Sequence, residues 1–139
     1  MIVVDTNVLS EALTPLPSPA VMAWLSKHSP TYRVPAVVLA EMWAGIEVLP
    51  AGARKKRLAL AIAKIEARTL LRDRLLPVTA EVARAFGSVV AMRQRKGRAT
   101  KPLDGLIAAT ALVHHAELAT RNTDDFAFLG LRLVNPWRE

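Results

Sequence analysis

The chain has 139 residues, of which 52% are hydrophobic and 22% charged, proportions that indicate a folded globular protein and exclude an intrinsically disordered one. It contains no cysteine, which excludes disulfides, thiolate metal sites and cysteine nucleophiles, so any metal ligands must be oxygen or histidine. Its 19 Lys and Arg residues outnumber 12 Asp and Glu residues, and the formal net charge of +7 favours association with polyanions such as nucleic acids. A solvated basic face is the alternative explanation of that charge.

The length fits one domain, spanning residues 1–139. No apolar run approaches the roughly 18 to 20 residues that a membrane-spanning helix needs. Asp5 also interrupts the N-terminal apolar stretch before the core of a signal peptide could form. We therefore expect a cytoplasmic protein with no membrane association.

The chain begins with an apolar run, residues 1–4, that predicts a buried strand ending at the carboxylate of Asp5. Residues 8–13 predict a short helical turn, which a proline-rich segment separates from helical spacing over residues 20–25. Residues 32–35 then predict the second strand.

The apolar spacing that starts at Ala36 predicts a helix that ends at Gly45 or Pro50 and carries Glu41. A further helix opens with four consecutive cations, residues 54–57, and has an apolar stripe at helical spacing. These two helices follow the second strand.

Residues 75–78 predict a third strand, at an edge of the sheet because they include a proline. Thr79 then predicts the cap of a long helix that runs to about Lys96 and is closed by Gly97. The end of this helix carries the densest cationic run of the chain, which suits either the helix dipole or phosphate binding.

The stretch from Thr100 to His115 predicts a buried helix, with Thr100 as its hydroxyl cap and Asp104 in its first turn. Residues 117–120 predict a central strand, and residues 131–134 predict the last strand. Alternating strands and helices predict an α/β fold with a single, mostly parallel, doubly wound sheet flanked by helices.

Acidic residues recur at equivalent places in this fold, where ligands bind beyond the carboxyl ends of the strands. Asp5 follows the first strand, Glu41 lies in the helix after the second, Asp104 begins the buried helix, and Asp124 or Asp125 follows the fourth strand. Each acid alone could be a helix cap or a solvated side chain. Together they favour a divalent metal site, because clustered carboxylates repel one another unless a cation neutralises them. Carboxylates without thiolates select Mg²⁺, or alternatively Mn²⁺.

Five motifs in chain order carry a resemblance to a known family: residues 4–11, 40–41, 103–111, 119–126 and 135–137. With them the chain resembles, from end to end, PIN-domain ribonucleases of the VapC toxin type, closest to the FitB-like branch. The resemblance implies a PIN-like fold, endonucleolytic cleavage of RNA with Mg²⁺ or Mn²⁺, and a homodimer. It also implies a cognate antitoxin whose C-terminal segment lies over the acidic pocket.

Three acids of this chain match the recurrent acids of the family: Asp5, Glu41 and Asp104. For the fourth position we choose Asp125, with Asn122 as a polar orienting residue, because relatives place an acid at either position. The chain departs from the family's usual pattern at residues 35–36 and 101–102, which affects loop geometry rather than the metal.

From these matches we expect Asp5 and Asp104 to hold the metal, with Glu41 and Asp125 completing the shell directly or through water. Thr6 and Asn7 are candidates to orient the acids by hydrogen bonds. A set of cations near the end of the long helix is expected to bind RNA phosphates: Arg93, Arg95, Lys96, Arg98 and Lys101.

Three apolar side chains, Trp43, Ile46 and Leu49, suggest an exposed helix face that forms the floor of a groove for the antitoxin. Two other function classes stay open. One is a non-catalytic, basic domain that binds nucleic acid or a protein partner, and metal-dependent RNA cleavage separates it from a nuclease. The other is a phospho-acceptor signalling domain, which usually has paired acids after the first strand, whereas Thr6 follows Asp5 here.

Overall fold

The computed structural model describes residues 1–139 and contains one five-stranded parallel sheet in the order β3-β2-β1-β4-β5. Every neighbouring pair of strands is parallel, with Ile2 paired to Tyr32 on one side of β1 and to Glu117 on the other. This arrangement confirms the predicted fold class. The strands are β1 (Ile2–Val4), β2 (Tyr32–Pro35), β3 (Leu75–Leu76), β4 (Glu117–Ala119) and β5 (Leu133–Val134).

Helices connect the strands as the alternating pattern predicts. The first crossover contains α1, the 3₁₀ helix η1 and α2, and the second contains α3 and α4. The third contains α5 and α6, and two further 3₁₀ helices, η2 and η3, flank β5. The bounds are α1 (Thr6–Ser10), η1 (Glu11–Leu13), α2 (Pro19–Lys27), α3 (Ala36–Glu47), α4 (Ala53–Leu71), α5 (Ala80–Arg95), α6 (Pro102–Val113), η2 (Thr123–Phe126) and η3 (Pro136–Arg138).

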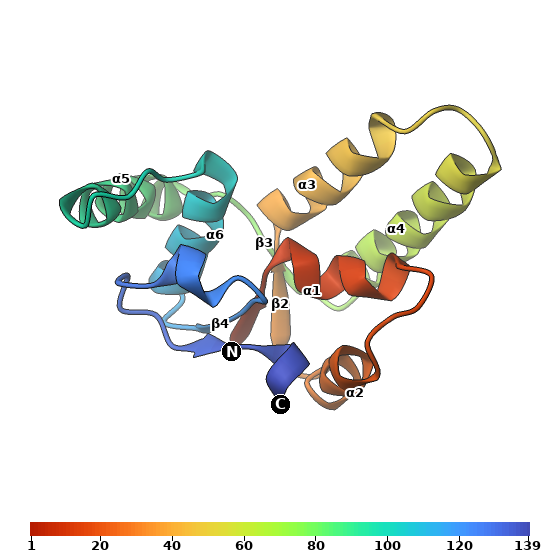
Figure 1. Ribbon diagram of the computed structural model, residues 1–139, viewed down its shortest axis with the longest axis horizontal. Coiled ribbons are helices and arrows are strands. Elements are labelled where there is room, and N and C mark those ends of the chain that lie inside the picture. The colour runs from red at the N-terminus through yellow and green to blue at the C-terminus, as the bar shows by residue number, and fades with distance from the viewer.

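The sheet reverses its winding direction at β1, its central strand. The chain moves from β1 outward to β2 and β3, and then returns across the sheet to β4 on the other side of β1. Figure 1 shows α5 and α6 on one side of the strands and α1, α2 and α4 on the other. The carboxyl ends of β1 and β4 therefore meet at a topological switch point, where open α/β sheets bind ligands.

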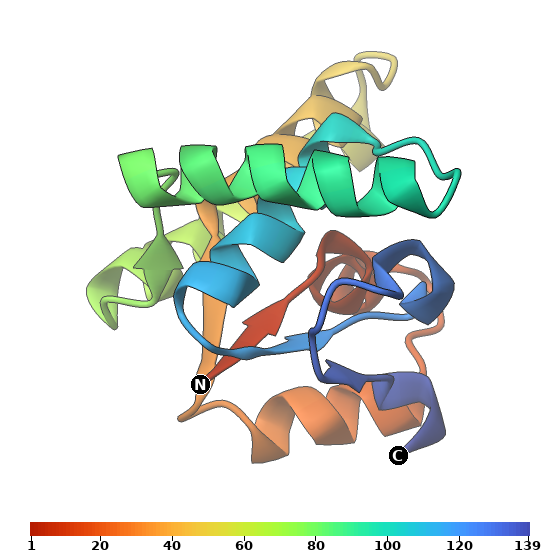
Figure 2. The ribbon, with the colours of Figure 1, turned by 90° about the vertical axis from the view of Figure 1, so that its left-hand side faces the viewer.

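A single apolar core fills the space between the sheet and both helical layers. The predicted buried helix, α6, has six buried residues, of which four belong to this core, and it packs against α5 and β1. Figure 2 shows α5 lying across α6. Because small side chains dominate α6, the helix approaches its neighbours closely, and the first turn that carries Asp104 has a fixed position.

The start of α6 differs from the sequence prediction. We expected the hydroxyl of Thr100 to cap this helix, but the N-cap is Lys101 and no side chain caps it. Pro102 at the first helical position explains the shift, since its fixed φ angle is suited to that position. The Thr100 hydroxyl is instead buried without a hydrogen-bond partner.

The exposed face predicted on α3 is also wrong. Ile46 is buried in the core, and Trp43 and Leu49 are half-buried against it. The indole nitrogen of Trp43 donates a 3.2 Å hydrogen bond to Oε1 of Glu66 on α4. The helix that follows α3 covers these side chains, and the periodicity of α3 alone does not reveal that cover.

None of the helices combines the length and the hydrophobicity that a membrane-spanning helix needs.

Candidate functional site

Asp5 is the buried centre of the acidic cluster. It leaves the end of β1 and caps α1, and its side chain is only 4% exposed. Its Oδ1 accepts a 2.7 Å hydrogen bond from the backbone N–H of Thr6. Its Oδ2 accepts bonds from the Thr120 hydroxyl at 2.7 Å and from the Asn7 side-chain amide at 3.2 Å. This network fixes the orientation of the carboxylate.

The environment of Asp5 opposes its ionisation when no cation is bound. Burial raises the pKa of Asp5 above its ordinary value, and the charge of Glu41 raises it further. The hydrogen bonds from Thr120, Thr6 and Asn7 act in the opposite direction without cancelling the effect of burial. A buried carboxylate held in one orientation but destabilised by its surroundings is one that a nearby cation would stabilise.

Glu41 and Asp104 reach the same place from two different helices. Each of Asp5, Glu41 and Asp104 offers one carboxylate oxygen, and these three oxygens lie within 4.8 Å of one another. Residues of α3 and α6 contact each other, which brings the two acids to the edge where β1 ends. The Thr6 hydroxyl also donates a 2.8 Å hydrogen bond to Oε1 of Glu41, so α1 orients this acid as well.

Asp104 experiences the same repulsion. Burial raises its pKa, the charges of Asp5 and Asp125 raise it as well, and Lys101 and Arg93 lower it. The net shift is upward. The favourable position of Asp104 in the first turn of a helix is therefore outweighed by burial and by its acidic neighbours.

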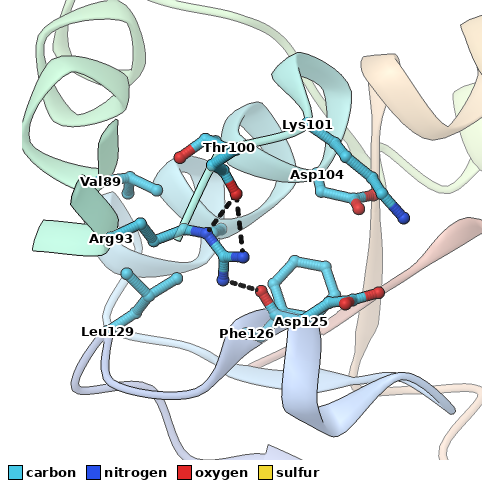
Figure 3. A pocket seen from close by; sticks show the side chains of 11 residues that line it. Val89, Arg93, Thr100, Lys101, Asp104, Asp125, Phe126 and Leu129 are labelled. Carbon is cyan, nitrogen blue, oxygen red and sulfur yellow. Dashed lines mark hydrogen bonds between the residues drawn. The ribbon is translucent and has the colours of Figure 1, made fainter. Parts of the chain in front are cut away.

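Asp125 lies beside Asp104 at a pocket of about 40 Å³ between α5, α6 and η2. Figure 3 shows the side chains of Asp104, Lys101 and Asp125 together on one side of this pocket. Asp125 is half-buried, whereas its neighbour Asp124 is exposed. The geometry thus brings three of the four predicted acids into one cluster, places Asp125 next to them, and leaves Asp124 outside.

The donor set of this cluster fits a divalent cation. It consists entirely of carboxylate oxygens from Asp5, Glu41 and Asp104, which is the ligand chemistry that Mg²⁺ and Mn²⁺ prefer. Two of these acids have raised pKa values because of burial and mutual repulsion. A bound cation would remove that repulsion, so the cluster has the electrostatic character of a metal site.

Comparison with protein families agrees with this fold: residues 2–129 match the model of the PIN domain. The chain belongs to the PIN domain family. It is 36% identical to the VapC ribonuclease Y4jK of Sinorhizobium fredii over 99% of this chain and 98% of that protein. It is 34% identical to the toxin FitB of Neisseria gonorrhoeae, with 100% of both chains covered.

A solved structure shows the same likeness in three dimensions. The crystal structure of FitAcB from Neisseria gonorrhoeae is 33% identical to this PIN domain, with a TM-score of 0.87 and 100% of both chains covered. These matches confirm the resemblance to the VapC type and its FitB-like branch that the acidic motifs indicate.

The predicted phosphate-binding cations of this PIN domain fall into two groups. Arg93 is half-buried, and its guanidinium donates hydrogen bonds to the backbone carbonyls of Ala99, at 3.1 and 3.3 Å, and of Asp125. It joins the loop after α5 to η2, as Figure 3 shows, so these donors are engaged within the protein. The other four cations, Arg95, Lys96, Arg98 and Lys101, have exposed side chains.

Sequence reasoning missed Thr120. Its hydroxyl is fully buried, donates to Asp5, and accepts a 3.0 Å hydrogen bond from the backbone N–H of Asn122. The signal was available, since a hydroxyl residue directly follows a strand that neighbours β1. The side chain of Asn122 itself is exposed and makes no hydrogen bond within the protein. Asn7 has a second contact, because its Oδ1 accepts from the backbone N–H of Arg121 at 3.2 Å.

A second and larger cleft, of about 420 Å³, lies between α1, α2 and α4. Its lining includes apolar side chains such as Leu25 and Ile65 and three arginines, Arg68, Arg72 and Arg74, but no acid. Because its lining contains no acid and no histidine, this cleft offers no carboxylate or imidazole ligand for a metal.

Proposed function

We propose that the chain is a divalent-metal-dependent endoribonuclease, the toxin of a type II toxin–antitoxin pair. The observation that carries the proposal is the cluster of three carboxylates, with oxygens within 4.8 Å of one another, on a protein with a net charge of +7. Carboxylates alone would repel a nucleic acid, and the positive charge elsewhere would attract one. Membership of the VapC and FitB branch of the PIN domain family supports this function.

In this proposal Asp5 and Asp104 would hold Mg²⁺ or Mn²⁺, and Glu41 and Asp125 would complete the shell directly or through water. When bound, the cation supplies Lewis-acid chemistry, activating water and stabilising the oxyanion that leaves the phosphodiester bond. The chain's own hydrogen bonds position the acidic ligands. Thr120, Asn7 and the backbone N–H of Thr6 hold the carboxylate of Asp5 in a single orientation.

Two other contacts prepare the site for a substrate. The hydroxyl of Thr6 fixes one oxygen of Glu41 and leaves its other oxygen free to accept a proton or orient a water molecule. Lys101 is exposed and lies close enough to Asp104 to lower its pKa. Its ammonium group is therefore placed to attract a phosphate to the edge of the acidic cluster.

The test is cleavage of RNA by the purified chain freed of any partner. We expect cutting of single-stranded or loop RNA with Mg²⁺ or Mn²⁺, complete loss of cutting with EDTA, and loss in Asp104→Asn. The matched control is Asp73→Asn, which removes the same charge from an exposed position after α4 and should leave cleavage unchanged. Cutting that survives EDTA, or that Asp104→Asn retains, would contradict the proposal.

The proposal includes two protein partners, a cognate antitoxin and a second copy of the chain. Both are motivated by membership of the VapC and FitB branch. A tagged chain recovered from its native host should bring down a protein whose addition stops RNA cleavage, and light scattering should give the mass of a homodimer for the free chain. Recovery of nothing except copies of the chain would remove the antitoxin from the proposal.

A further inference from the structure

Phe128 combines two unusual properties. Its side chain is 58% exposed, although most large apolar side chains near the acidic site are buried. Its backbone has a φ angle of +66°, in the left-handed region that bulky residues rarely adopt. Glycine would suit this backbone better, and an exposed ring adds little to the core. Folding therefore does not explain a phenylalanine at this position.

Two cations lie over the ring of Phe128. The Nζ of Lys96 is 5.4 Å from the ring centroid, and the Cζ of Arg98 is 5.2 Å from it. Neither cation forms a salt bridge, since the only ion pair of the chain joins Arg132 to Glu117. We call these three side chains the Phe128 patch. It presents an aromatic ring and two uncompensated positive charges on one surface.

The patch lies near Asp125, the acid next to the cluster of Asp5, Glu41 and Asp104. Arg98 donates a 3.0 Å hydrogen bond to the backbone carbonyl of Asp124, and Arg93 binds the carbonyls of Ala99 and Asp125. Figure 2 shows the loop after α5 and η2 on the same side of the molecule. Phe128 follows Asp125 by three residues, a span of at most about 11 Å between Cα atoms. One RNA strand can therefore reach the acids and the patch together.

We propose that Phe128 stacks on a base of the RNA substrate, while Lys96 and Arg98 bind the phosphates on either side of that base. This inference rests on the proposed ribonuclease function and adds a binding residue to it. Aromatic rings flanked by cations are the usual means by which proteins hold single-stranded nucleic acid without reading its sequence. In this arrangement the acidic residues serve the cleavage step, and the Phe128 patch binds the RNA close to the cleaved bond.

The test compares Phe128→Gly with Phe128→Trp. The glycine variant removes the ring and suits the left-handed backbone, so its melting temperature should not fall below that of the wild type. It should bind short single-stranded RNA in EDTA about 5- to 150-fold more weakly, the range expected for one stacked base. In the presence of metal its KM should rise while its kcat stays the same. The tryptophan variant should restore both RNA affinity and KM.

The RNA supplies an independent readout. With wild-type protein, an abasic nucleotide at one position of the RNA should weaken binding, and with Phe128→Gly the same lesion should have no further effect. Lys96→Ala and Arg98→Ala should each reduce the slope of log affinity against log salt by about 0.7, and Phe128→Gly should leave that slope unchanged. Exposed residues of α4 provide the controls, Leu60→Ala for the loss of an exposed apolar side chain and Arg57→Ala for the cations.

Three results would overturn the inference, and they separate it from the proposed function. If the wild type cleaves RNA and Phe128→Gly has the same KM and RNA affinity, Phe128 does not bind the RNA, and the proposed ribonuclease function is unaffected. If Phe128→Gly lowers the melting temperature and kcat together, the ring supports the turn instead of the RNA. If the wild type neither binds nor cleaves RNA, the proposed function fails and the inference fails with it.

Discussion

The hydroxyl of Thr120 donates a 2.7 Å hydrogen bond to Oδ2 of Asp5, joining two residues that are 115 positions apart in the sequence. Thr120 directly follows β4 and Asp5 directly follows β1, and these strands are parallel neighbours. Both residues are buried. The bond therefore links the carboxyl ends of two central strands and orients the most buried acid of the proposed metal site.

Replacing Thr120 with valine removes this bond while nearly preserving the shape of the side chain. The bond lowers the pKa of Asp5, so its loss should raise that already raised pKa further. The carboxylate would be less well solvated, and we expect the metal-free protein to lose about 1–3 kcal/mol of stability near neutral pH. This loss should shrink as the pH falls and Asp5 becomes protonated. Urea unfolding at several pH values measures it.

The same substitution should weaken Mg²⁺ or Mn²⁺ binding by about 10- to 100-fold, the usual effect of removing a partner of a metal ligand. Thr110→Val is the matched control, because Thr110 is equally buried but donates to the carbonyl of Leu106 within α6. Calorimetric titration should show wild-type metal affinity for this control. Equal affinities for Thr120→Val and the wild type would remove Thr120 from the site.

Gly105 allows α5 and α6 to approach closely next to the acidic cluster. A Cβ atom at this position would lie 2.7 Å from Cε2 of Phe86 and 2.7 Å from Cγ2 of Thr100. Gly105→Ala should therefore destabilise the protein by about 1–3 kcal/mol, as overpacking in a well-filled core does. Because Asp104 is the preceding residue, the shift in α6 should also reduce the proposed metal-dependent cleavage of RNA.

A second glycine on the adjoining helix gives the opposite expectation. Gly87 lies within α5, and a Cβ atom there would meet nothing within 4 Å. Gly87→Ala should stabilise the protein by about 0.5–1 kcal/mol through helix propensity alone. Thermal melts of both variants test the pair, and a stable Gly105→Ala protein would contradict the close packing of α5 against α6.

The acidic cluster could be predicted from the sequence because its residues lie at the ends of strands and in the helices that follow them. Asp5 ends an apolar run that is too short for anything except a strand, and Asp104 opens an unusually apolar helix. Parallel strands bring such positions to one edge of the sheet. The order of the elements and the convergence of Asp5, Glu41 and Asp104 both follow from these local patterns.

Other features could not be predicted because they depend on which segments become neighbours. Nothing near Arg93 in the sequence shows that its guanidinium would bind the carbonyl of Asp125, which is 32 residues away. The burial of Ile46 likewise depends on contacts made only in the folded chain. A hydroxyl before a helix, as at Thr100, is a good sign of a cap, but a proline two residues later moved the cap to Lys101.

The raised pKa values predict an unusual effect of pH on the metal-free protein. A carboxyl group whose folded pKa lies above its unfolded value stabilises the fold below the unfolded pKa, and that contribution is lost as the pH rises through the folded pKa. Asp104 is such a group, with a pKa raised from 3.8 by burial and by Asp5. At about pH 7 the melting temperature of metal-free Asp104→Asn should therefore equal or exceed that of the metal-free wild type. This difference in melting temperature should vanish at pH values below the pKa of Asp104 in the unfolded chain.

The same variant should lose the stabilisation that Mg²⁺ gives by binding the folded form alone. Glu81→Gln is the control, because Glu81 is exposed in the first turn of α5 and interacts chiefly with the helix dipole. That change should cost about 0.3–1 kcal/mol and leave the Mg²⁺ effect intact. If Asp104→Asn behaved like Glu81→Gln, Asp104 would be a helix-start residue and not a metal ligand.

The last prediction concerns the fourth acid, for which Asp124 and Asp125 are adjacent candidates in η2. Asp125 is half-buried and raises the pKa of Asp104, whereas Asp124 is exposed. Asp125→Asn should lower kcat by about 10- to 100-fold and lower the pKa of Asp104, measurable by carboxyl NMR titration, while Asp124→Asn should change neither. The fold should survive, because Arg93 binds the backbone carbonyl of Asp125 and not its side chain. A strong loss of kcat in Asp124→Asn with Asp125→Asn near wild type would reverse the assignment.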